Sequence, residues 1–448
     1  MTLTPNELRQ RSSYRRAVEA FIWGIPAVNF EMMYDALVRD ARGGPNQIVY
    51  WSRLLDGKNQ TLTPNPDAIY LMAFYDTTDG PVVLEIPAAG DGSITGSIDD
   101  AWQCAIEDVG PAGIDAGAGG KCLILPPDHL DDVPDGYLPM RSATRSGYAL
   151  LRSNLRSGAD ADVEAAVAYG KKVRLYPLAE AERNPSTTFV DAADVVFDAK
   201  IPYDHTFFHA LDRRIQAEPW LPRDKAMIDF CASFGIVKGQ PFTPDETTTA
   251  MLDDAMHEVR AWLDDRYVRS YAASFYDDAR WALPASPALI EASTTNYGNP
   301  NTYPIDDRAM SYSMAFFSAK RLGTGQFYLM TIADELGDPL DGATTYRLHI
   351  PARVPVSLYW SVTAYDRHTH TLIRDVPWAS RSSHTPGLTE HDDGSIDVVF
   401  GPTAPRDAVD NWVPTRSGEP FELLFRFYGP LEPLFDKTWR LPDVTPMP

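Results

Sequence analysis

Apolar residues recur at helical spacing near the start of the chain and again through its middle. In residues 5–41 the spacing of Val18 and Phe21 is typical of one helix face, and Pro26 is expected to kink or restart that helix. Between residues 159 and 275 the same period predicts four more helices. These two parts of the chain are therefore expected to be mainly helical.

Two other parts of the chain show short apolar runs separated by turn residues, as β-strands do. Residues 47–155 contain several such runs, and the two runs on either side of the turn at residues 77–80 predict a β-hairpin. Near the C-terminus Leu423, Phe425 and Phe427 alternate with residues of the other strand face. This alternation is typical of a sheet with one buried face.

The chain of 448 residues is longer than one ordinary hydrophobic core requires. The periodicity predicts an α+β fold with two β-rich, sandwich or jelly-roll-like modules joined by a mainly helical segment. We expect an N-terminal helix and β module over residues 1–155, a helical connecting segment over 156–324 and a C-terminal β-sandwich over 325–448.

Short motifs in a fixed order resemble those of a two-module bacterial family. They begin with P-N-P-D-A-I-Y at Pro64, P-V-V-L at Pro81 and D-A-W at Asp100, and continue with L-H-I-P, Y-W-S-V-T-A-Y-D and F-R-F-Y-G-P near the C-terminus. The two parts of that family are domains of unknown function twelve-fifty-four and twelve-fourteen. The resemblance covers nearly the whole chain and implies the two modules, but it implies no reaction.

Composition excludes several classes of partner. A formal net charge of −22 argues against nucleic acid and anionic membrane surfaces. The first residues lack the pattern of a signal peptide, and no apolar run is long enough to span a membrane. We expect a cytoplasmic protein that binds a small-molecule substrate, with a homo-oligomer left open. The alternative is an exported protein, as many relatives are, if a leader precedes this sequence.

The stiff corner around Asn65, between two prolines, is the first candidate for chemistry. If Asp67 meets Asp100, the two carboxylates could differ in pKa and act as acid and base. Asn65 and Tyr70 would then orient the substrate or stabilise an oxyanion, and Trp102 would stack on a ring. The alternative is that both carboxylates only hydrogen-bond the backbone of their loops.

Further candidates come from aromatic and basic residues elsewhere in the chain. The substrate-binding candidates are Trp102, Tyr303, Arg308, Trp360, Tyr365 and Arg381. Arg308 or Arg381 would hold an anionic group of the ligand. The competing interpretation of Arg381 is a structural ion pair with Asp366 or Asp397. Arg426 and Tyr428 accompany this C-terminal set.

Histidines offer only weak metal-binding patterns. His205 and His209 are four residues apart on a predicted helix, and His368 and His370 alternate after an aspartate. We expect these to be ordinary surface or core histidines, with the second pair exposed, and His349 to be a core residue. Three scattered cysteines do not suggest a metal cluster. No organic cofactor and no tightly bound transition metal are expected.

These features favour an enzyme that acts on a small polar or ring-containing metabolite by carboxylate acid–base chemistry. Hydrolysis or elimination would take place in a pocket between the two β modules. The alternative is a non-catalytic carbohydrate or small-molecule binding protein with an aromatic platform. A closed pocket with Asp67 and Asp100 in contact would favour the enzyme, and an open aromatic groove would favour the binding protein.

Overall fold

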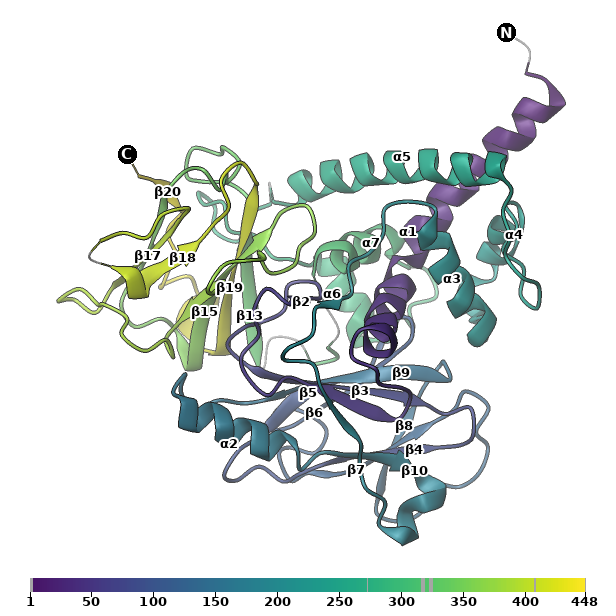
Figure 1. Cartoon of the computed structure of the whole chain (residues 1–448), viewed down its shortest axis with the longest axis horizontal. Helices are drawn as coiled ribbons and strands as arrows, with labels where there is room; N and C mark the ends of the chain where they lie inside the picture. The colour runs from purple at the N-terminus through teal and green to yellow at the C-terminus, as the bar shows by residue number, and fades with distance from the viewer. Residues whose placement is uncertain (1–2, 272, 316–318, 322–324, 407, 448) are drawn as a thin grey trace.

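The computed structural model describes residues 3–271, 273–315, 319–321, 325–406 and 408–447. The fold is of the predicted α+β class: two β modules lie next to each other, and a group of helices lies over the N-terminal module and reaches the C-terminal one (Figure 1). None of the described helices combines the length and the apolar character that a membrane span requires.

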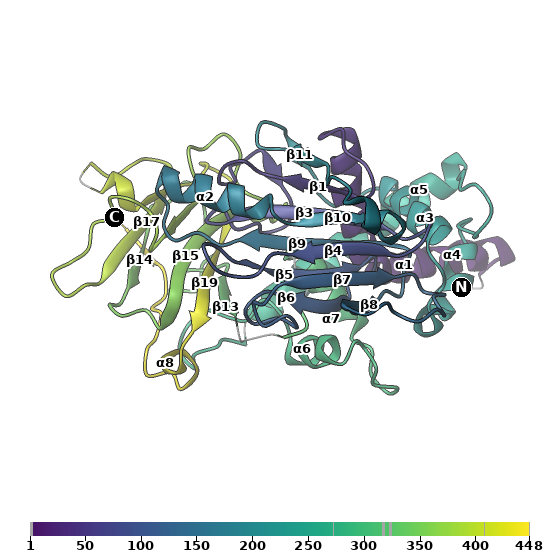
Figure 2. The ribbon, with the colours of Figure 1, turned by 90° about the horizontal axis from the view of Figure 1, so that it is seen from below.

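The N-terminal module is a sandwich of two sheets, seen from below in Figure 2. The larger sheet consists, in pairing order, of β11 (Phe189–Asp191), β1 (Gln47–Tyr50), β3 (Ile69–Asp76), β9 (Ser146–Ser153), β5 (Ile94–Asp100) and β6 (Ala105–Val109). The smaller sheet consists of β10 (Arg174–Pro177), β4 (Val82–Ile86), β7 (Gly120–Leu125) and β8 (Tyr137–Arg141). Outside the sandwich, β2 (Asn59–Gln60) pairs with β12 (Phe197–Asp198).

Alternation along β3 assigns its side chains to two different cores. Leu71 and Ala73 point into the sandwich and pack with Leu84 of the smaller sheet. Tyr70 and Met72 belong to the core on the opposite face of the sheet. The opposite face therefore carries Tyr70 toward the helices and the C-terminal module.

The predicted hairpin across residues 77–80 is wrong. β3 and β4 belong to different sheets, so this turn carries the chain from one layer of the sandwich to the other. Both strands are buried along most of their length. Two apolar runs around a short turn do not reveal whether the strands pair edge to edge or stack face to face.

The N-terminal module extends beyond the predicted boundary at residue 155. The helix α2 (Asp160–Gly170) contacts β3 and β9, and after it β10 and β11 add a strand to each sheet. The sequence predicts helix through residue 178, but the chain leaves the helix after Gly170. Val173 and Leu175 then pack into the sandwich core, which favours the extended conformation over the local helical period.

The helix α1 (Pro5–Arg39) runs through Pro26 without a break. A capping box starts it, because Thr4 Oγ1 accepts a hydrogen bond from the Glu7 amide and the Glu7 carboxylate accepts one from the Thr4 amide. A proline inside a helix costs about 3 kcal/mol. Every residue from Ala20 to Glu31 is buried, and this burial offsets the cost, so the helix does not restart at Pro26.

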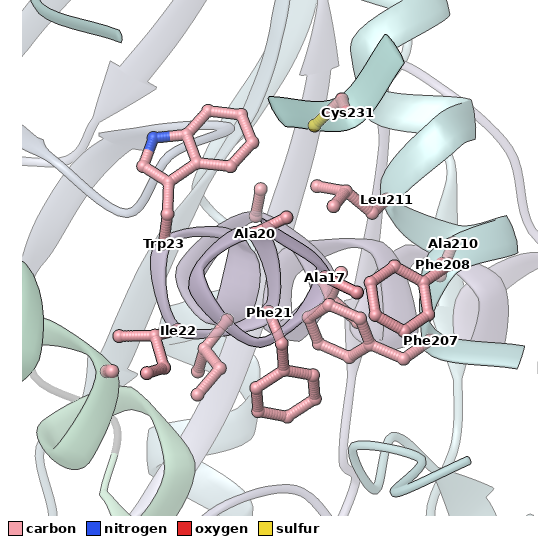
Figure 3. Packing of buried hydrophobic residues seen from close by; sticks show 14 of the residues in the cluster. Ala17, Ala20, Phe21, Ile22, Trp23, Phe207, Phe208, Ala210, Leu211 and Cys231 are labelled. Atoms are coloured by element: carbon pink, nitrogen blue, oxygen red, sulfur yellow. The ribbon is translucent and has the colours of Figure 1, made fainter. Parts of the chain in front are cut away.

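The other helices are α3 (Thr206–Ala217), α4 (Ala226–Ala232), α5 (Glu246–Tyr271), α6 (Pro287–Thr294), α7 (Ile305–Met314) and the short α8 (Glu432–Phe435), with 3-10 turns η1 (Leu178–Arg183), η2 (Pro222–Asp224) and η3 (Val409–Asn411). The helices α3, α4, α5 and α7 contact α1. In Figure 3 Phe207 and Leu211 of α3 approach α1, and the rings of Phe21 and Phe207 are 3.9 Å apart. The three helices predicted between residues 203 and 267 are confirmed as α3, α4 and α5.

The C-terminal module is a second sandwich, as predicted. One sheet contains β13 (Gln326–Thr331), β19 (Phe421–Pro430), β15 (Val356–Asp366) and β16 (Ser380–Ser382), in that order. The other contains β18 (Trp412–Pro414), β17 (Ile396–Gly401), β14 (Tyr346–Ile350) and β20 (Thr445–Pro446). Leu348 and Val398 of the second sheet pack on Val362 and Phe425 of the first.

The first sheet of this module is buried on both faces. Phe425 and Phe427 of β19 point into the sandwich core, as the alternation predicts. Arg426 and Tyr428, on the other face, are also buried, because this face lies against the corner that contains Asn65. The polar face therefore belongs to an interface inside the molecule and does not face solvent.

The end of α5 is attached to the C-terminal module through buried polar groups. Tyr267 donates a hydrogen bond of 2.5 Å to Glu422, and His370 Nδ1 lies 2.8 Å from the other Glu422 oxygen. The expectation that His370 is exposed is wrong. After β15 the chain turns, because Asp366 accepts a hydrogen bond from the His368 amide, and the turn directs His370 inward and leaves His368 exposed.

Candidate functional site

The corner that contains Asn65 lies against the polar sheet face of the C-terminal module. The Asn65 side-chain amide donates hydrogen bonds to the hydroxyls of Tyr359 at 3.0 Å and Tyr428 at 2.8 Å. Its side-chain oxygen accepts a hydrogen bond of 3.0 Å from the Asp67 amide. Asn65 thus fixes two tyrosines of the other module. The two rings are nearly parallel, with centroids 4.2 Å apart.

Tyr70 and Arg152 form a cross-strand pair at the end of the larger N-terminal sheet. Arg152 Nε donates a hydrogen bond of 3.1 Å to the Tyr70 hydroxyl, and its guanidinium carbon lies 5.1 Å from the centre of the Tyr70 ring. The same hydroxyl accepts a hydrogen bond of 3.2 Å from the backbone amide of Asn65. Because the phenol oxygen already accepts two hydrogen bonds, its own proton can be donated elsewhere.

Two cavities meet at Arg152. The inner one has a volume of about 30 Å³, and Tyr70, Tyr328 and Arg426 line it together with Arg152. The outer one has a volume of about 400 Å³, and its lining includes Arg152, Tyr359 and Tyr428. A volume of a few hundred Å³ is typical of small-molecule pockets, and the inner cavity has room for about two waters.

Both arginines at these cavities lack an acidic partner. In the part of the chain that the structure describes, no carboxylate oxygen lies within 4.0 Å of Arg152 or Arg426. Arg426 donates to neutral oxygens: the Tyr365 hydroxyl at 2.6 Å, Thr363 Oγ1 at 3.1 Å and the Thr63 carbonyl at 2.8 Å.

Arg152 has still fewer partners. Within the described residues, the hydrogen bond from Nε to Tyr70 is the only one that the Arg152 side chain makes. Its remaining N–H groups, at the point where the cavities meet, have no acceptor among the residues that the structure describes. Charged groups inside proteins are normally paired, so a guanidinium of this kind indicates a site for an anion.

The outer cavity also has an acidic residue on its wall. Asp108 accepts hydrogen bonds of 3.0 Å from the Lys320 amide and 2.6 Å from the Arg321 amide. The side chains of Lys320 and Arg321 in turn lie within 4.0 Å of the Glu107 carboxylate. This group of two acids and two bases has no net charge, so it leaves Arg152 as the unbalanced charge of the cavity.

Asp67 lies behind the cavity wall. Its carboxylate accepts a hydrogen bond of 2.5 Å from Ser380 Oγ, and it is absent from the lining of both cavities. Burial raises the pKa of Asp67, while hydrogen bonds from Ser380 and Ser382 and the nearby charge of Arg426 oppose the rise. Asp67 therefore connects the corner to β16.

We expect Asp67→Asn to raise the stability of the protein near neutral pH. Because the pKa of Asp67 is higher in the folded state, its stabilising contribution is complete below the unfolded pKa and is lost as pH rises through the folded one. An asparagine carries no charge to bury and can still accept from Ser380. The melting temperature of the variant should exceed that of the parent at pH 7, and the gain should vanish toward about pH 4. The exposed substitution Asp79→Asn is the control, and a loss of stability at pH 7 would contradict this account.

The structure does not bring Asp67 and Asp100 together. Asp100 lies at the far end of β5, where the sheet pairs it with Gly147. Ile94, at the other end of β5, lies beside Ser153, which pairs with Ile69 next to the corner. Six residues of strand separate the two ends by about 20 Å. A carboxylate pair that exchanges protons is therefore not formed.

Asp100 instead organises its own loop. Its carboxylate accepts hydrogen bonds from the amides of Trp102 at 2.8 Å and Cys104 at 2.9 Å. Burial raises the pKa of Asp100, and the charge of Arg223 opposes the rise. This is the alternative role that the sequence left open for Asp100.

Trp102, Tyr303 and Arg308 lie together in a second cluster beneath α1. Trp102 packs on Trp23, with ring centroids 4.5 Å apart. Arg308 donates to the Trp102 carbonyl and to the Tyr303 hydroxyl, and its guanidinium carbon lies 4.5 Å from the centre of the Tyr297 ring. None of these residues lines either of the two cavities at Arg152.

The candidate residues of the C-terminal module lie on opposite faces of their sheet, and only one face is directed toward the corner that contains Asn65. Tyr365 accepts from Arg426 and donates a hydrogen bond of 2.6 Å to the Pro64 carbonyl, next to the candidate site. Trp360 stacks on Phe425 in the sandwich core. Arg381 points away from the corner and stacks on Trp378 at 4.2 Å, and burial lowers its pKa to about 10.

Arg381 also forms no ion pair with Asp366 or Asp397. It donates instead to the carbonyls of Ser380 and Val409. Within the described residues, the salt bridges of Asp397 are to other basic groups, namely Arg347, His349 and His391. Neither the binding role nor the ion pair considered for Arg381 matches its surroundings.

Sequence reasoning missed Arg152, Tyr328 and Tyr359. The available signal was weak: Arg152 is a charged residue close to the end of an otherwise apolar strand, and Tyr359 has the same strand parity as Tyr365. Such positions usually face solvent. Only the contact between the modules places them at the two cavities, with Tyr328 at the inner one, Tyr359 at the outer one and Arg152 at both.

The histidines differ from expectation at one further position. His205 Nδ1 lies 3.0 Å from an Asp253 oxygen, and the rings of His205 and His209 are 6.3 Å apart. His349 was expected in the core, but its side chain is 45% exposed and lies 2.7 Å from Asp397. Its strand position faces outward, because Leu348 and Ile350 point into the sandwich.

Comparison with known proteins identifies the two modules but no activity. Residues 45–177 match Protein of unknown function (DUF1254), and residues 325–432 match Protein of unknown function (DUF1214). No curated protein matches the chain. The crystal structure of the VPA0106 protein from Vibrio parahaemolyticus is 18% identical, with a TM-score of 0.61, over 97% of this chain and 100% of that one.

A second solved structure is more distant. An uncharacterized protein from Burkholderia cenocepacia is 10% identical, with a TM-score of 0.42, over 98% of this chain and 94% of that one. The Vibrio protein shares the fold, which agrees with the two sandwiches and the helices described above. Both family matches fall on β modules of the structure, in the order in which the sequence motifs occur. The chain therefore belongs to the family in which a DUF1254 domain precedes a DUF1214 domain.

Proposed function

We propose that the protein binds a small organic anion in the outer cavity between its two β modules and acts on it by acid–base chemistry. The observation that carries this proposal is the Arg152 guanidinium, which borders both cavities and has no carboxylate within 4.0 Å among the described residues. A carboxylate or phosphate of the ligand would supply the missing charge and accept the unused N–H groups.

The shape of the outer cavity supports a ring-containing ligand. Tyr359 and Tyr428 form a parallel stack on its wall, and His384 stacks on the outer face of Tyr359 at 4.6 Å. Both faces of Tyr359 are therefore covered, and the stack would offer ring edges to the cavity, which can pack edge to face against a ring of the ligand. The proposed substrate class is therefore a small acid that carries a ring or an unsaturated group.

Tyr70 is the proposed proton donor. Its hydroxyl accepts hydrogen bonds from Arg152 and from the Asn65 amide, so its proton is available to the inner cavity that Tyr70 lines. That cavity has room for about two waters next to Tyr70, and one of them would carry the proton to a ligand that Arg152 holds in the outer cavity. Water beside a proton donor favours hydrolysis: Tyr70 would protonate the leaving group while water adds to the substrate, and the proton released by that water would return to Tyr70. Elimination is the second reaction class, but it also needs a base to accept the substrate proton.

The alternative function is binding without catalysis. It is favoured by a specific observation: Asp67 and Asp100, the carboxylates expected to act as a pair, are separated along β5 and each hydrogen-bonds its own surroundings. In this case the Tyr359–Tyr428 stack would be an aromatic platform, and Arg152 would select acidic ligands.

The test is a binding screen of small ring-containing carboxylic acids, each compared with its neutral amide. We expect acids to raise the melting temperature and to bind in calorimetry, while the matching amides do not, because an amide cannot neutralise Arg152. Arg381→Gln should bind as the parent does, since Arg381 lies away from both cavities. Equal binding of acids and amides would contradict the proposal.

The mixtures of protein and bound acid from this screen also decide between an enzyme and a binding protein. NMR spectra of each bound acid, recorded over hours with the protein present, should show a product if the acid–base proposal holds. Acids that bind but remain unchanged, across hydrolysable and eliminable compounds alike, would support the binding protein.

A further inference from the structure

Two histidines and an aspartate converge on the outer sheet of the C-terminal module. His349 Nδ1 lies 2.7 Å from one oxygen of Asp397, and His391 Nε2 lies 3.3 Å from the other. One potential ligand atom from each side chain lies within 4.8 Å of the other two. This cluster is separate from the cavities at Arg152.

The backbone holds all three side chains in place. His349 on β14 and Asp397 on β17 are direct cross-strand partners. The loop that carries His391 returns to β17 through a hydrogen bond of 2.9 Å from the His391 amide to the Ser395 carbonyl. The Asn411 side-chain amide donates to carbonyls on either side of His391, at Thr389 and Asp397, each at 2.9 Å. The three side chains are thus supported by strands and by a fixed turn.

We propose that His349, His391 and Asp397 bind a divalent transition-metal ion of the zinc class. Two imidazole nitrogens and a carboxylate are a common ligand set for such ions. Ligand bonds of about 2.0–2.2 Å at tetrahedral angles place ligand atoms about 3.3–3.5 Å apart. The 3.3 Å between His391 Nε2 and Asp397 matches this spacing, whereas His349 Nδ1 is hydrogen-bonded to Asp397 at 2.7 Å and would move outward by about 0.6 Å when an ion replaces the shared proton. Three protein ligands leave a fourth position for water or an external ligand.

Two features of the surroundings predict an exchangeable ion. The side chains of His349 and His391 are 45% and 54% exposed, so solvent reaches the site. The Arg347 guanidinium lies 3.9 Å from Asp397 and would oppose a cation there. The ion is therefore expected to be lost during purification and to return when it is added, in agreement with the expectation that the isolated protein carries no tightly bound transition metal.

The experiment is a calorimetric titration of EDTA-treated, dialysed protein with zinc chloride, together with elemental analysis of protein and buffer after equilibrium dialysis against micromolar zinc. We expect one zinc ion per chain at micromolar zinc. His391→Ala and His349→Ala should each weaken binding at least about tenfold, since each removes a ligand. His368→Ala, which removes an exposed histidine outside the cluster, should bind as the parent does.

Circular dichroism of each variant verifies that it is folded, which is expected because both histidines are exposed and contact solvent. Failure of the parent to bind zinc at micromolar concentration would overturn the proposal. Unchanged affinity in both ligand variants would also overturn it, since the zinc would then bind elsewhere. Loss of binding in His368→Ala alone would assign the ion to a different site. This result would also overturn the proposal.

Discussion

Replacing Arg152 by methionine should make the protein more stable and unable to hold its ligand. The Arg152 charge is partly removed from water without an acidic partner within 4.0 Å among the described residues. Replacing even a buried ion pair by apolar residues often stabilises proteins by about 1–4 kcal/mol, and Arg152 lacks the compensation that a paired charge receives. The lost contact between the guanidinium and Tyr70 offsets part of this gain. A net gain of about 1–2 kcal/mol is expected in denaturant unfolding of the ligand-free protein.

The same variant should bind the acids found in the screen about 100-fold more weakly or worse. Charge-assisted hydrogen bonds contribute about 1.5–3 kcal/mol each, and a guanidinium can make two to one carboxylate. Arg381→Met is the matched control, because Arg381 also stacks on an aromatic ring but lies outside both cavities. It donates to two backbone carbonyls, so its replacement should lower stability and leave affinity unchanged. An Arg152→Met protein that is less stable but binds normally would show that Arg152 has a structural role.

Tyr70→Phe should abolish most of the turnover while the ligand still binds. Positioned proton donors typically contribute about 100- to 10,000-fold in rate, and phenylalanine keeps the ring under Arg152 but removes the donor. The Asn65 amide loses its acceptor, so a stability cost of about 1–2 kcal/mol is expected as well. The measurements are the rate of product formation with the substrate identified by NMR, and the binding affinity of that substrate.

Tyr365→Phe is the matched control for this experiment. Tyr365 is buried, donates to the Pro64 carbonyl and accepts from Arg426, but lines neither cavity. Its replacement should cost a similar amount of stability and leave turnover near normal. If both variants kept normal turnover, Tyr70 would not be the proton donor. If both lost it equally, the effect would arise from disturbed packing between the modules.

The general electrostatics of the chain fit a local site for an anion. The formal net charge is −22, so the surface as a whole repels anionic molecules. An acidic ligand in the outer cavity would therefore be bound by the local charge of Arg152 and not by long-range attraction. We expect the affinity for the acidic ligand to rise when salt screens the surface charges. The attraction between Arg152 and the ligand, inside the cavity, is screened less than the repulsion from the surface.

The sequence by itself determined the elements that local chemistry specifies. The helical period identified α3, α4 and α5, and the alternation in β19 identified its core face through Phe425 and Phe427. Motif order also identified the family and both β modules. These features depend on residues close together in the chain, whose spacing can be counted directly.

Only the tertiary structure decided which strands pair and which polar residues meet. The sheet change between β3 and β4, the continuous passage of α1 through Pro26 and the inward turn of His370 all depend on packing against distant segments. Arg152 of one module meets Tyr428 of the other across more than half of the chain. A polar residue on a strand has the same local pattern whether it faces water or another module, so its role depends on what covers that face.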